Sequence, residues 1–271
     1  MKRVFLGSVV GTCAALLLAV SVGATELTAN QIMLLNEKAR KSTNEVSDVT
    51  MILRDSKGNE RTREVVWIAD DTDDLNRKSL IRFLSPQDVA GTGLLSIEHE
   101  DKDDDRWLYL PALRKVRRIS AGDKSENFMG TDFAFEDLVI EDGIVSQKQH
   151  KYRILGSDVR DGFDCYVIEA IPATDKEIRE SGYSKREIWI TKDRFIAIYA
   201  KYWDKGGELI KQLMSVDVRP TEGGGQYRAH RLLMENFRTG HTTTFIFKHY
   251  RLNQKIDSAK IFTQRFLESN R

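Results

Sequence analysis

Apolar and polar residues alternate with two different periods along the chain. Between Thr28 and Ser42, apolar residues recur every three or four positions, which is typical of one face of a helix. Thr28 and Gln31 have the spacing of a capping box at the start of that helix. From Val49 onward the period falls to two, as in a strand with one buried face. The pattern therefore predicts one N-terminal amphipathic helix followed by many strands.

The predicted strands are short and closely spaced. The turn residues 56–59 join the first two as a hairpin. The strands are expected over residues 49–52, 60–68, 78–84, 93–100, 106–110, 114–119, 151–157, 164–171, 185–191, 195–203, 208–218, 227–238 and 242–252, with a terminal helix over 262–267. Long helices do not separate these strands, so the pattern favours an antiparallel sheet over a parallel α/β sheet.

Several of these strands have one apolar and one polar face. Phe245 and Phe247, for example, alternate with Thr244 and Lys248. Such a pattern indicates a single-layer sheet that is covered on one side only. Two kinds of cover remain open at this point: an ordinary core closed by the sheet curling on itself, or a wide apolar cavity beneath a thin lid.

The segment from Arg106 to Leu138 carries the strongest signal in the chain. An aromatic strand that ends at Pro111 is followed by a basic strand and then by a polar loop that holds four large apolar side chains. These apolar residues can be buried plugs of the core, or a flap that covers a ligand. The cations of the basic strand can serve solubility and edge protection, or contact anionic headgroups or an acidic partner.

Three motifs follow one another in this segment. They are W-x-Y-x-P at Trp107, Tyr109 and Pro111, R-R-I at residues 117–119, and F-x-G-T-D-F-x-x-E-D-L at residues 128–138. Together they resemble the LolA-like family of outer-membrane lipoprotein-sorting proteins. Outside this block the likeness is one of pattern alone.

The resemblance implies a mainly β protein with an α lid: a single half-open antiparallel β-barrel with an N-terminal helix and a helical or loop flap over its concave face. It also implies a periplasmic carrier whose concave face holds acyl chains, often beside a lipid exporter of the resistance-nodulation-division type. With the strand alternation, it gives as candidate cavity residues Ile81, Phe83, Leu95, Ile97, Trp107, Tyr109, Ile188, Ile190, Ile198, Met214, Val216, Phe245 and Phe247.

The remaining candidate residues belong to the lid and to the basic strand. The lid candidates are Phe128, Met129, Phe133, Phe135 and Leu138. The candidates for contact with a headgroup or partner are Arg114, Lys115, Arg117 and Arg118.

The N-terminus has the pattern of a secretory signal peptide. Lys2 and Arg3 precede an apolar stretch, and Val22, Gly23 and Ala24 form a small-x-Ala cleavage signal. We therefore expect residues 1–24 to be removed, residues 25–271 to form the lipid-binding domain, and the mature protein to be periplasmic. An uncleaved anchor helix is the alternative.

The charge of the sequence argues against one class of partner, and its cysteine content leaves one thiol in the mature protein. Without Lys2 and Arg3, the 42 basic residues fall to 40 against 41 acidic ones, which argues against nucleic acid as a partner. Cleavage leaves Cys165 as the one cysteine, in an alternating segment where it is expected to be a small buried apolar residue.

Catalytic and metal-binding motifs are missing from the sequence. There is no G-x-S-x-G elbow, P-loop or H-E-x-x-H, and the aspartates from Asp101 lack the Gly and Glu of an EF-hand loop. We expect no enzyme activity, metal or cofactor, although a triad assembled from distant residues is not visible in one sequence.

The sequence thus predicts a periplasmic carrier for the acyl chains of a lipoprotein or lipid, served by an inner-membrane exporter of the resistance-nodulation-division or ABC type. The alternative is an envelope lipid sensor that binds lipid without transporting it. The pattern names neither the cargo, the transporter nor the oligomeric state.

Overall fold

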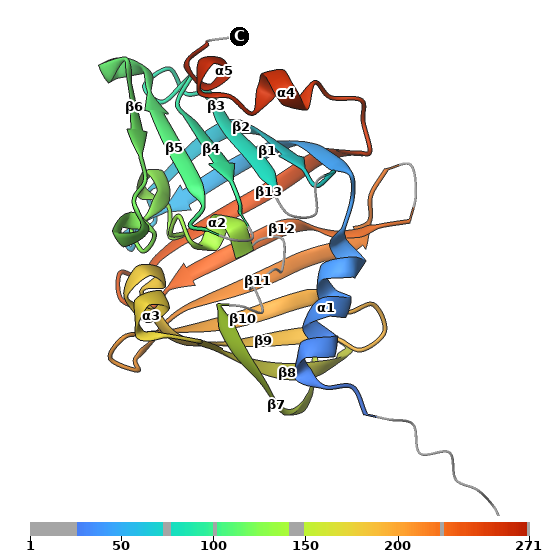
Figure 1. Cartoon of the computed structure of the whole chain (residues 1–271). Coiled ribbons are helices and arrows are strands. Elements are labelled where there is room, and N and C mark those ends of the chain that lie inside the picture. Colours follow the sequence, from blue (N-terminus) through green and yellow to red (C-terminus); the bar gives the residue numbers. More distant parts are fainter. Residues whose placement is uncertain (1–25, 73–76, 100–101, 141–148, 223–224, 270–271) are drawn as a thin grey trace, which may run out of the picture.

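Most of the chain folds around one large sheet. The computed structural model describes residues 26–72, 77–99, 102–140, 149–222 and 225–269, so the predicted signal peptide lies outside the described residues. Thirteen strands in these residues form one antiparallel sheet in the order β6-β5-β4-β3-β2-β1-β13-β12-β11-β10-β9-β8-β7. Because β6 and β7 lie at opposite ends of this order, the curled sheet is a half-open barrel (Figure 1). The predicted fold class is confirmed.

The strands and helices have the following bounds. The strands are β1 (Asn44–Arg54), β2 (Glu60–Asp70), β3 (Lys78–Ser85), β4 (Gly93–Ile97), β5 (Asp105–Leu110), β6 (Lys115–Arg118), β7 (His150–Arg160), β8 (Phe163–Pro172), β9 (Tyr183–Thr191), β10 (Ala197–Asp204), β11 (Leu209–Pro220), β12 (Tyr227–Asn236) and β13 (His241–Leu252). The helices are α1 (Ala29–Arg40), η1 (Pro111–Leu113), η2 (Ala121–Asp123), η3 (Phe128–Gly130), α2 (Asp137–Ile140), α3 (Asp175–Ser181), α4 (Ser258–Ile261) and α5 (Gln264–Glu268).

Helix α1 begins as the sequence predicts. Thr28 and Gln31 form the reciprocal capping box, which satisfies the first backbone N–H groups of the helix. Ile32 and Met33 are buried against the sheet. Asn36 is buried beside them and donates a hydrogen bond from Nδ2 to the Phe195 carbonyl at 2.6 Å. These contacts hold α1 across the strands of the second half of the sheet (Figure 1).

The first hairpin is also confirmed. Residues of β1 and β2 pair from Asn44 with Asp70 to Arg54 with Glu60. In the turn, one carboxylate oxygen of Asp55 accepts the backbone N–H groups of Lys57 and Asn59, at 2.8 and 2.9 Å. Gly58 has a φ of 85°, a conformation that glycine adopts without steric cost. This turn chemistry fixes the register of the hairpin.

Helix α3 was not predicted. A capping box of Thr174 and Glu177 starts it, and Gly182 ends it in the left-handed conformation with a φ of 81°. Both signals stand in the sequence, but the helix is only seven residues long. It packs beside β8 and β9, next to the lid described below.

The outer, convex face of the sheet is less polar than the alternation predicts. One apolar cluster there contains Cys165, Trp189 and Tyr199. A second contains Leu80, Leu95 and Tyr109, which pack against Phe262 and Leu267 of the C-terminal segment. The predicted polar outer face is therefore wrong in these two places.

Cys165 is a buried thiol of the first outer cluster, as expected. Its Sγ lies 3.4 Å from the Phe163 carbonyl oxygen. Burial raises the pKa of this thiol to about 11. A neutral, buried thiol of this kind behaves as a small apolar side chain rather than as a nucleophile.

The C-terminal helices are fastened to the outer face by a buried arginine. Arg82 of β3 donates from Nη2 to the carbonyl oxygens of Phe266 and Leu267, at 2.7 and 3.1 Å. These bonds satisfy the last carbonyls of α5, and the Leu267 side chain is fully buried. The C-terminal segment is thus an integral part of the sheet's outer core.

We expect Leu267→Ala to lower the free energy of unfolding by about 2–5 kcal/mol, because it leaves a cavity in the outer cluster. Urea denaturation measures the change. The matched control is Leu113→Ala at a side chain that is 62% exposed, which should shift the free energy by less than about 0.5 kcal/mol. Equal effects of the two changes would contradict this role of the C-terminal segment.

Candidate functional site

The concave face of the sheet is lined by apolar side chains from nearly every strand. Cross-strand pairing places Val49 opposite Val65 and Phe247, and Met51 opposite Phe245. The same face continues through Trp67, which pairs with Ile81. These residues belong to one cluster, here called the concave cluster, which reaches from β5 to β8 and includes α1.

The segment from Ser120 to Leu138, here called the lid, fills the middle of this concave face. Phe133 stacks on Phe245 with ring centroids 4.3 Å apart and an interplanar angle of 14°. Phe128 packs against Phe83 at 5.7 Å and against Phe135 at 5.6 Å. The rings in all three contacts belong to the concave cluster, so the chain's own rings occupy the hollow.

The backbone hydrogen bonds of the lid are largely internal. The Phe128 N–H donates to the Phe133 carbonyl at 2.8 Å, and the Phe135 N–H donates to the Glu126 carbonyl at 3.0 Å. The Glu136 N–H likewise donates to the Lys124 carbonyl at 2.9 Å. Since these bonds are made within the segment, most of the lid's backbone groups would stay paired if it moved away from the sheet.

A buried carboxylate joins the tip of the lid to the sheet. Asp132 accepts hydrogen bonds from the Thr243 hydroxyl at 2.8 Å and from the Asn236 side-chain amide at 3.2 Å. The Asp132 N–H donates to the same Thr243 hydroxyl oxygen at 2.9 Å. Nearby, Arg63 donates to the Met129 carbonyl at 2.6 Å. We call the Asp132, Thr243 and Asn236 contact the latch.

A second carboxylate fixes the end of the lid. Asp137 accepts from the Ala134 N–H at 2.7 Å and from the Tyr183 hydroxyl at 2.8 Å, and the Lys211 ammonium lies 3.6 Å away. Burial, reinforced by the charge of Asp137, raises the pKa of Tyr183 well above its usual value. The tyrosine therefore stays neutral and remains a hydrogen-bond donor.

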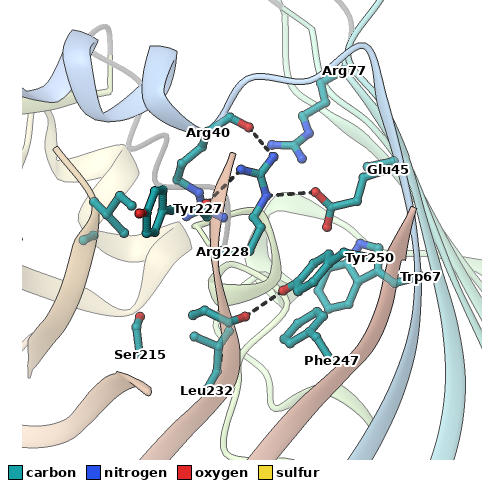
Figure 2. Close-up of a pocket in the computed structure, with 14 residues that line it drawn as sticks. Arg40, Glu45, Trp67, Arg77, Ser215, Tyr227, Arg228, Leu232, Phe247 and Tyr250 are labelled. Atoms are coloured by element: carbon teal, nitrogen blue, oxygen red, sulfur yellow. Dashed lines mark hydrogen bonds and ion pairs between the residues drawn. The ribbon is translucent and has the colours of Figure 1, made fainter. Parts of the chain in front are cut away.

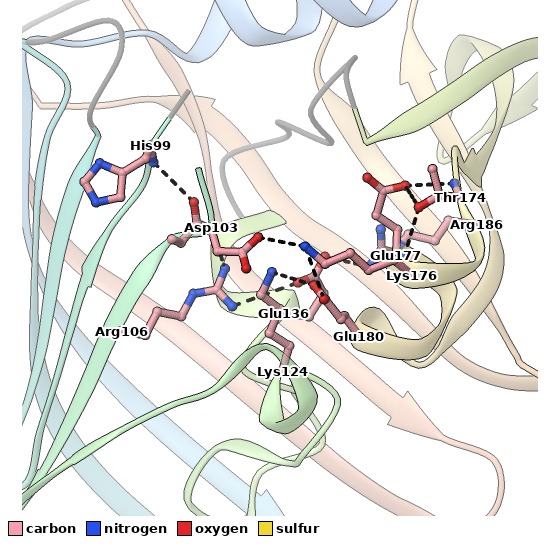
Figure 3. A network of polar contacts seen from close by, with 11 residues as sticks. His99, Asp103, Arg106, Lys124, Glu136, Thr174, Lys176, Glu177, Glu180 and Arg186 are labelled. Carbon is pink, nitrogen blue, oxygen red and sulfur yellow. Dashed lines mark hydrogen bonds and ion pairs between the residues drawn. The ribbon is translucent and has the colours of Figure 1, made fainter. Parts of the chain in front are cut away.

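Ion pairs connect the base of the lid to both halves of the sheet (Figure 3). Glu136 lies between Arg106 of β5 and Arg186 of β9, with N···O distances of 4.0 and 3.6 Å. Lys124 pairs with Glu180 of α3 at 3.3 Å. Because these side chains are at least 85% buried, their separation would cost more than that of surface ion pairs. The base holds several buried charged side chains where the latch holds one, so separating the base leaves more buried charges without partners.

The predicted cavity residues divide between the two faces of the sheet. Those in the concave cluster are Ile81, Phe83, Ile188, Ile190, Phe245 and Phe247. The outer clusters contain Leu95, Ile97, Trp107, Tyr109, Ile198 and Met214, while Val216 pairs with the exposed Arg231 and lies in none of the clusters. Alternation shows which residues share a face but not which face is concave, and these seven residues lie outside the concave cluster.

The predicted lid residues lie together over the concave face. Phe128, Phe133, Phe135 and Leu138 are buried in the concave cluster, and Met129 is partly buried against it. Their burial fits a core plug as well as a lid, so their role in covering a ligand remains a prediction.

The basic strand β6 lies at an edge of the sheet. Arg117 pairs with Asp123 at 3.0 Å, and Arg118 pairs with Asp105 at 2.6 Å. The hydrogen bond to Asp123 raises the pKa of Arg117. Arg114 and Lys115 are exposed. Their contact with a headgroup or partner also remains a prediction.

One part of the concave face is open beside the lid. This pocket lies between the end of α1 and strands β1, β2 and β10–β13, over Trp67, Phe247 and Tyr250 (Figure 2). Its water-accessible volume of about 40 Å³ has room for a few water molecules but not for an acyl chain. In this closed form, a large ligand would have to displace the lid.

Two further features bear on the chemistry of the site. Among the described residues, no three His, Cys, Asp or Glu side chains gather in a way that could hold a metal ion. The same part of the chain contains no helix that is both long and apolar enough to cross a membrane.

Comparison with known proteins agrees with this architecture. A family model described as "-like: Uncharacterized protein" matches residues 75–269, which is more than half of the chain. The structure of an outer-membrane lipoprotein-sorting protein domain from Vibrio parahaemolyticus is similar, with a TM-score of 0.78 and 29% identity over 88% of this chain and 97% of that one.

The chain belongs to the family whose model matches residues 75–269, and its fold is LolA-like. A DUF1329 family protein from Desulfovibrio piger is similar at a TM-score of 0.78 and 29% identity, over 87% of this chain and 96% of that one. A LolA superfamily protein from Nitrosomonas europaea shares the fold at a TM-score of 0.66 and 19% identity, over 89% of this chain and all of that one. No curated protein matches the chain.

The LolA-like motif at residues 128–138 now has a physical explanation. Its phenylalanines fill the concave face, and its Asp132 and Asp137 hold the lid to the sheet. Both aspartates stand in the motif, but the sequence alone gives them no role, because their partners Thr243 and Tyr183 stand far along the chain.

We expect Asp132→Asn to loosen the tip of the lid, because the amide turns donors toward Thr243 and Asn236 and loses the charge that strengthens the latch. Amide hydrogen exchange over residues 128–135 should accelerate by roughly tenfold or more. The control is Asp123→Asn, at a carboxylate whose Arg117 partner is half exposed. Equal exchange in the two variants would show that the latch does not hold the lid.

Proposed function

We propose that this protein is a periplasmic carrier that binds the acyl chains of a lipoprotein or lipid on its concave face and passes them toward the outer membrane. The observation that carries the proposal is the apolar concave face, which the lid's phenylalanines cover with a segment whose backbone hydrogen bonds are largely internal. The signal-peptide pattern and the likeness to a lipoprotein-sorting domain support the periplasmic location.

The free energy gained by burying the lid's apolar side chains is comparable to that gained by burying one acyl chain. The lid buries three phenylalanines and Leu138, and each large apolar side chain contributes about 1.5–3 kcal/mol, or roughly 6–12 kcal/mol together. One sixteen-carbon chain contributes about 12 kcal/mol, at roughly 0.8 kcal/mol per methylene. A single chain thus matches the apolar burial of the lid, and two or three chains also offset the polar contacts that opening breaks. The proposed cargo is therefore a lipid or lipoprotein with several acyl chains.

The lid opens first at its tip. The latch and the stacked Phe133 separate from β12 and β13, while Glu136 and Lys124 keep the base in place. Release is the reverse step, in which the lid's phenylalanines compete with the departing chains. A membrane-bound exporter of the resistance-nodulation-division or ABC type is the proposed partner that delivers or removes the cargo.

Phe133→Ala should bind lipid more tightly than the natural protein. Losing the stacked ring weakens the closed form by about 3–5 kcal/mol, and a larger population of the open form raises the apparent affinity. Detergent-free purification followed by native mass spectrometry measures the lipid-bound fraction. Phe237→Ala, at a ring that is 47% exposed, is the control. A lower bound fraction in Phe133→Ala would mean that Phe133 is part of a permanent core.

Transfer between donor and acceptor vesicles separates a carrier from a sensor. We expect the natural protein to move a diacylated fluorescent lipid faster than spontaneous exchange does. Binding without transfer would assign the protein to lipid sensing, and a protein that stays empty would contradict both functions.

A further inference from the structure

The open pocket beside the lid combines an apolar floor with a cationic rim. Trp67, Phe247 and Tyr250 form part of the floor, and Arg40, Arg77 and Arg228 contribute three guanidinium groups to the lining. In Figure 2, the side chains of Arg77 and Arg228 point toward one another across the pocket. We call this pocket the mouth, because it is where the concave face meets solvent.

The lining of the mouth holds more cationic than anionic side chains. Among the lining residues, Glu45 is the one carboxylate, at 3.0 Å from Arg228 Nε. Asp71 pairs with Arg77 from outside the lining, at 2.8 Å. Guanidinium groups gathered beside low-dielectric aromatic rings favour an anion between them.

The small pocket at the base of the lid has the opposite character. Its lining contains the carboxylates of Asp103, Glu136, Glu177 and Glu180 against the ammonium groups of Lys124 and Lys176. An anionic group is therefore favoured at the mouth and disfavoured at this second pocket. The two ends of the concave face therefore differ: an anionic headgroup is favoured at the mouth, and acyl chains are favoured in the apolar middle.

A continuous row of rings connects the mouth to the lid. Tyr250 stacks on Phe247 at 5.4 Å, and Phe247 lies 6.1 Å from Trp67. Trp67 lies 6.4 Å from Phe245, on which the lid's Phe133 stacks. If the lid lifts, the place left by Phe133 joins the mouth as one apolar path.

We propose that the mouth binds the anionic headgroup, a phosphate or carboxylate, of a lipid whose acyl chains take the place of the lid's phenylalanines. This inference rests on the proposed function and adds to it the class of headgroup. Arg40 and Arg77 bind the head, because guanidinium groups match the planar, bidentate geometry of phosphate and carboxylate oxygens.

Arg228 has a different, structural part in the mouth. It is buried and donates from Nη2 to the Arg40 carbonyl at 2.6 Å, which caps the C-terminal end of α1, and its Nε bonds Glu45. It adds positive potential, but its removal would disturb the fold. Arg40 and Arg77 are less buried than Arg228, so their replacement tests the inference with less disturbance of structure.

The test compares two lipids that have the same acyl chains and differ in one phosphate headgroup. Dipalmitoyl phosphatidate and dipalmitoylglycerol are placed at equal mole fractions in phosphatidylcholine vesicles, and lipid extracted by the protein is quantified after the vesicles are removed. The natural protein should extract phosphatidate roughly tenfold better, the gain expected from charge-assisted hydrogen bonds in a partly wet site. Arg40→Gln and Arg77→Gln should lose most of this preference while still extracting dipalmitoylglycerol.

Arg153→Gln on β7 is the matched control, because it removes one exposed arginine from the opposite edge of the sheet and should keep the preference. Equal extraction of both lipids, or an unchanged preference in Arg40→Gln and Arg77→Gln, would overturn the headgroup assignment and leave the carrier function standing. Extraction of neither lipid would overturn both. Thermal unfolding of each variant verifies that it is folded.

A second arm distinguishes a lipid head from a free anion. Inorganic phosphate alone is titrated against the natural protein by calorimetry, and we expect weak binding that does not compete with phosphatidate extraction at equal concentration. Phosphate binding as tight as that of phosphatidate, and lost in Arg77→Gln, would assign the mouth to a free anion and overturn the lipid proposal.

Discussion

The structure depends on one constraint: the apolar concave face of a curled sheet must be covered, and the chain has little helix with which to cover it. Helix α1 covers the second half of the sheet, and the lid covers the middle with the stack of Phe133 on Phe245 at its centre. Apolar rings without directional bonds are the part of a protein interior that another hydrocarbon can replace at little cost. The same burial therefore stabilises the empty protein and defines what it can bind.

Polar contacts determine which end of the lid separates from the sheet more easily. The latch is a single buried carboxylate with two neutral donors, whereas the base of the lid is held by ion pairs with Arg106, Arg186 and Glu180. A buried charge that keeps its partners is tolerated, and one that loses them is costly, so the base resists separation more than the tip. This difference makes the lid a flap with a fixed edge rather than a loose loop.

The sequence predicted most of the fold because local signals specify it. The capping box of Thr28, the turn at Asp55 and the period of two from Val49 onward each depend on neighbours a few residues away. Helix α3 was missed although its capping box at Thr174 is equally local, since a seven-residue helix leaves almost no periodic pattern.

The site was predicted less well because it depends on distant partners. Alternation placed Tyr109 and Phe245 in one set, yet they face opposite sides of the sheet, and only the direction of curling decides which side is concave. The latch joins residues 111 positions apart, and the mouth gathers Arg40, Arg77 and Arg228 from three separate elements. No spacing in a single sequence encodes such convergence.

The exchange of lid for ligand can be tested directly by locking the lid. Asp132 and Thr243 are in side-chain contact, so cysteines at both positions, in a background of Cys13→Ser and Cys165→Ala, can form a disulfide across the latch. The oxidised protein should extract no diacylated lipid from vesicles, and reduction should restore extraction. Equal extraction by the oxidised and reduced forms would show that acyl chains do not enter beneath the lid and would contradict the account.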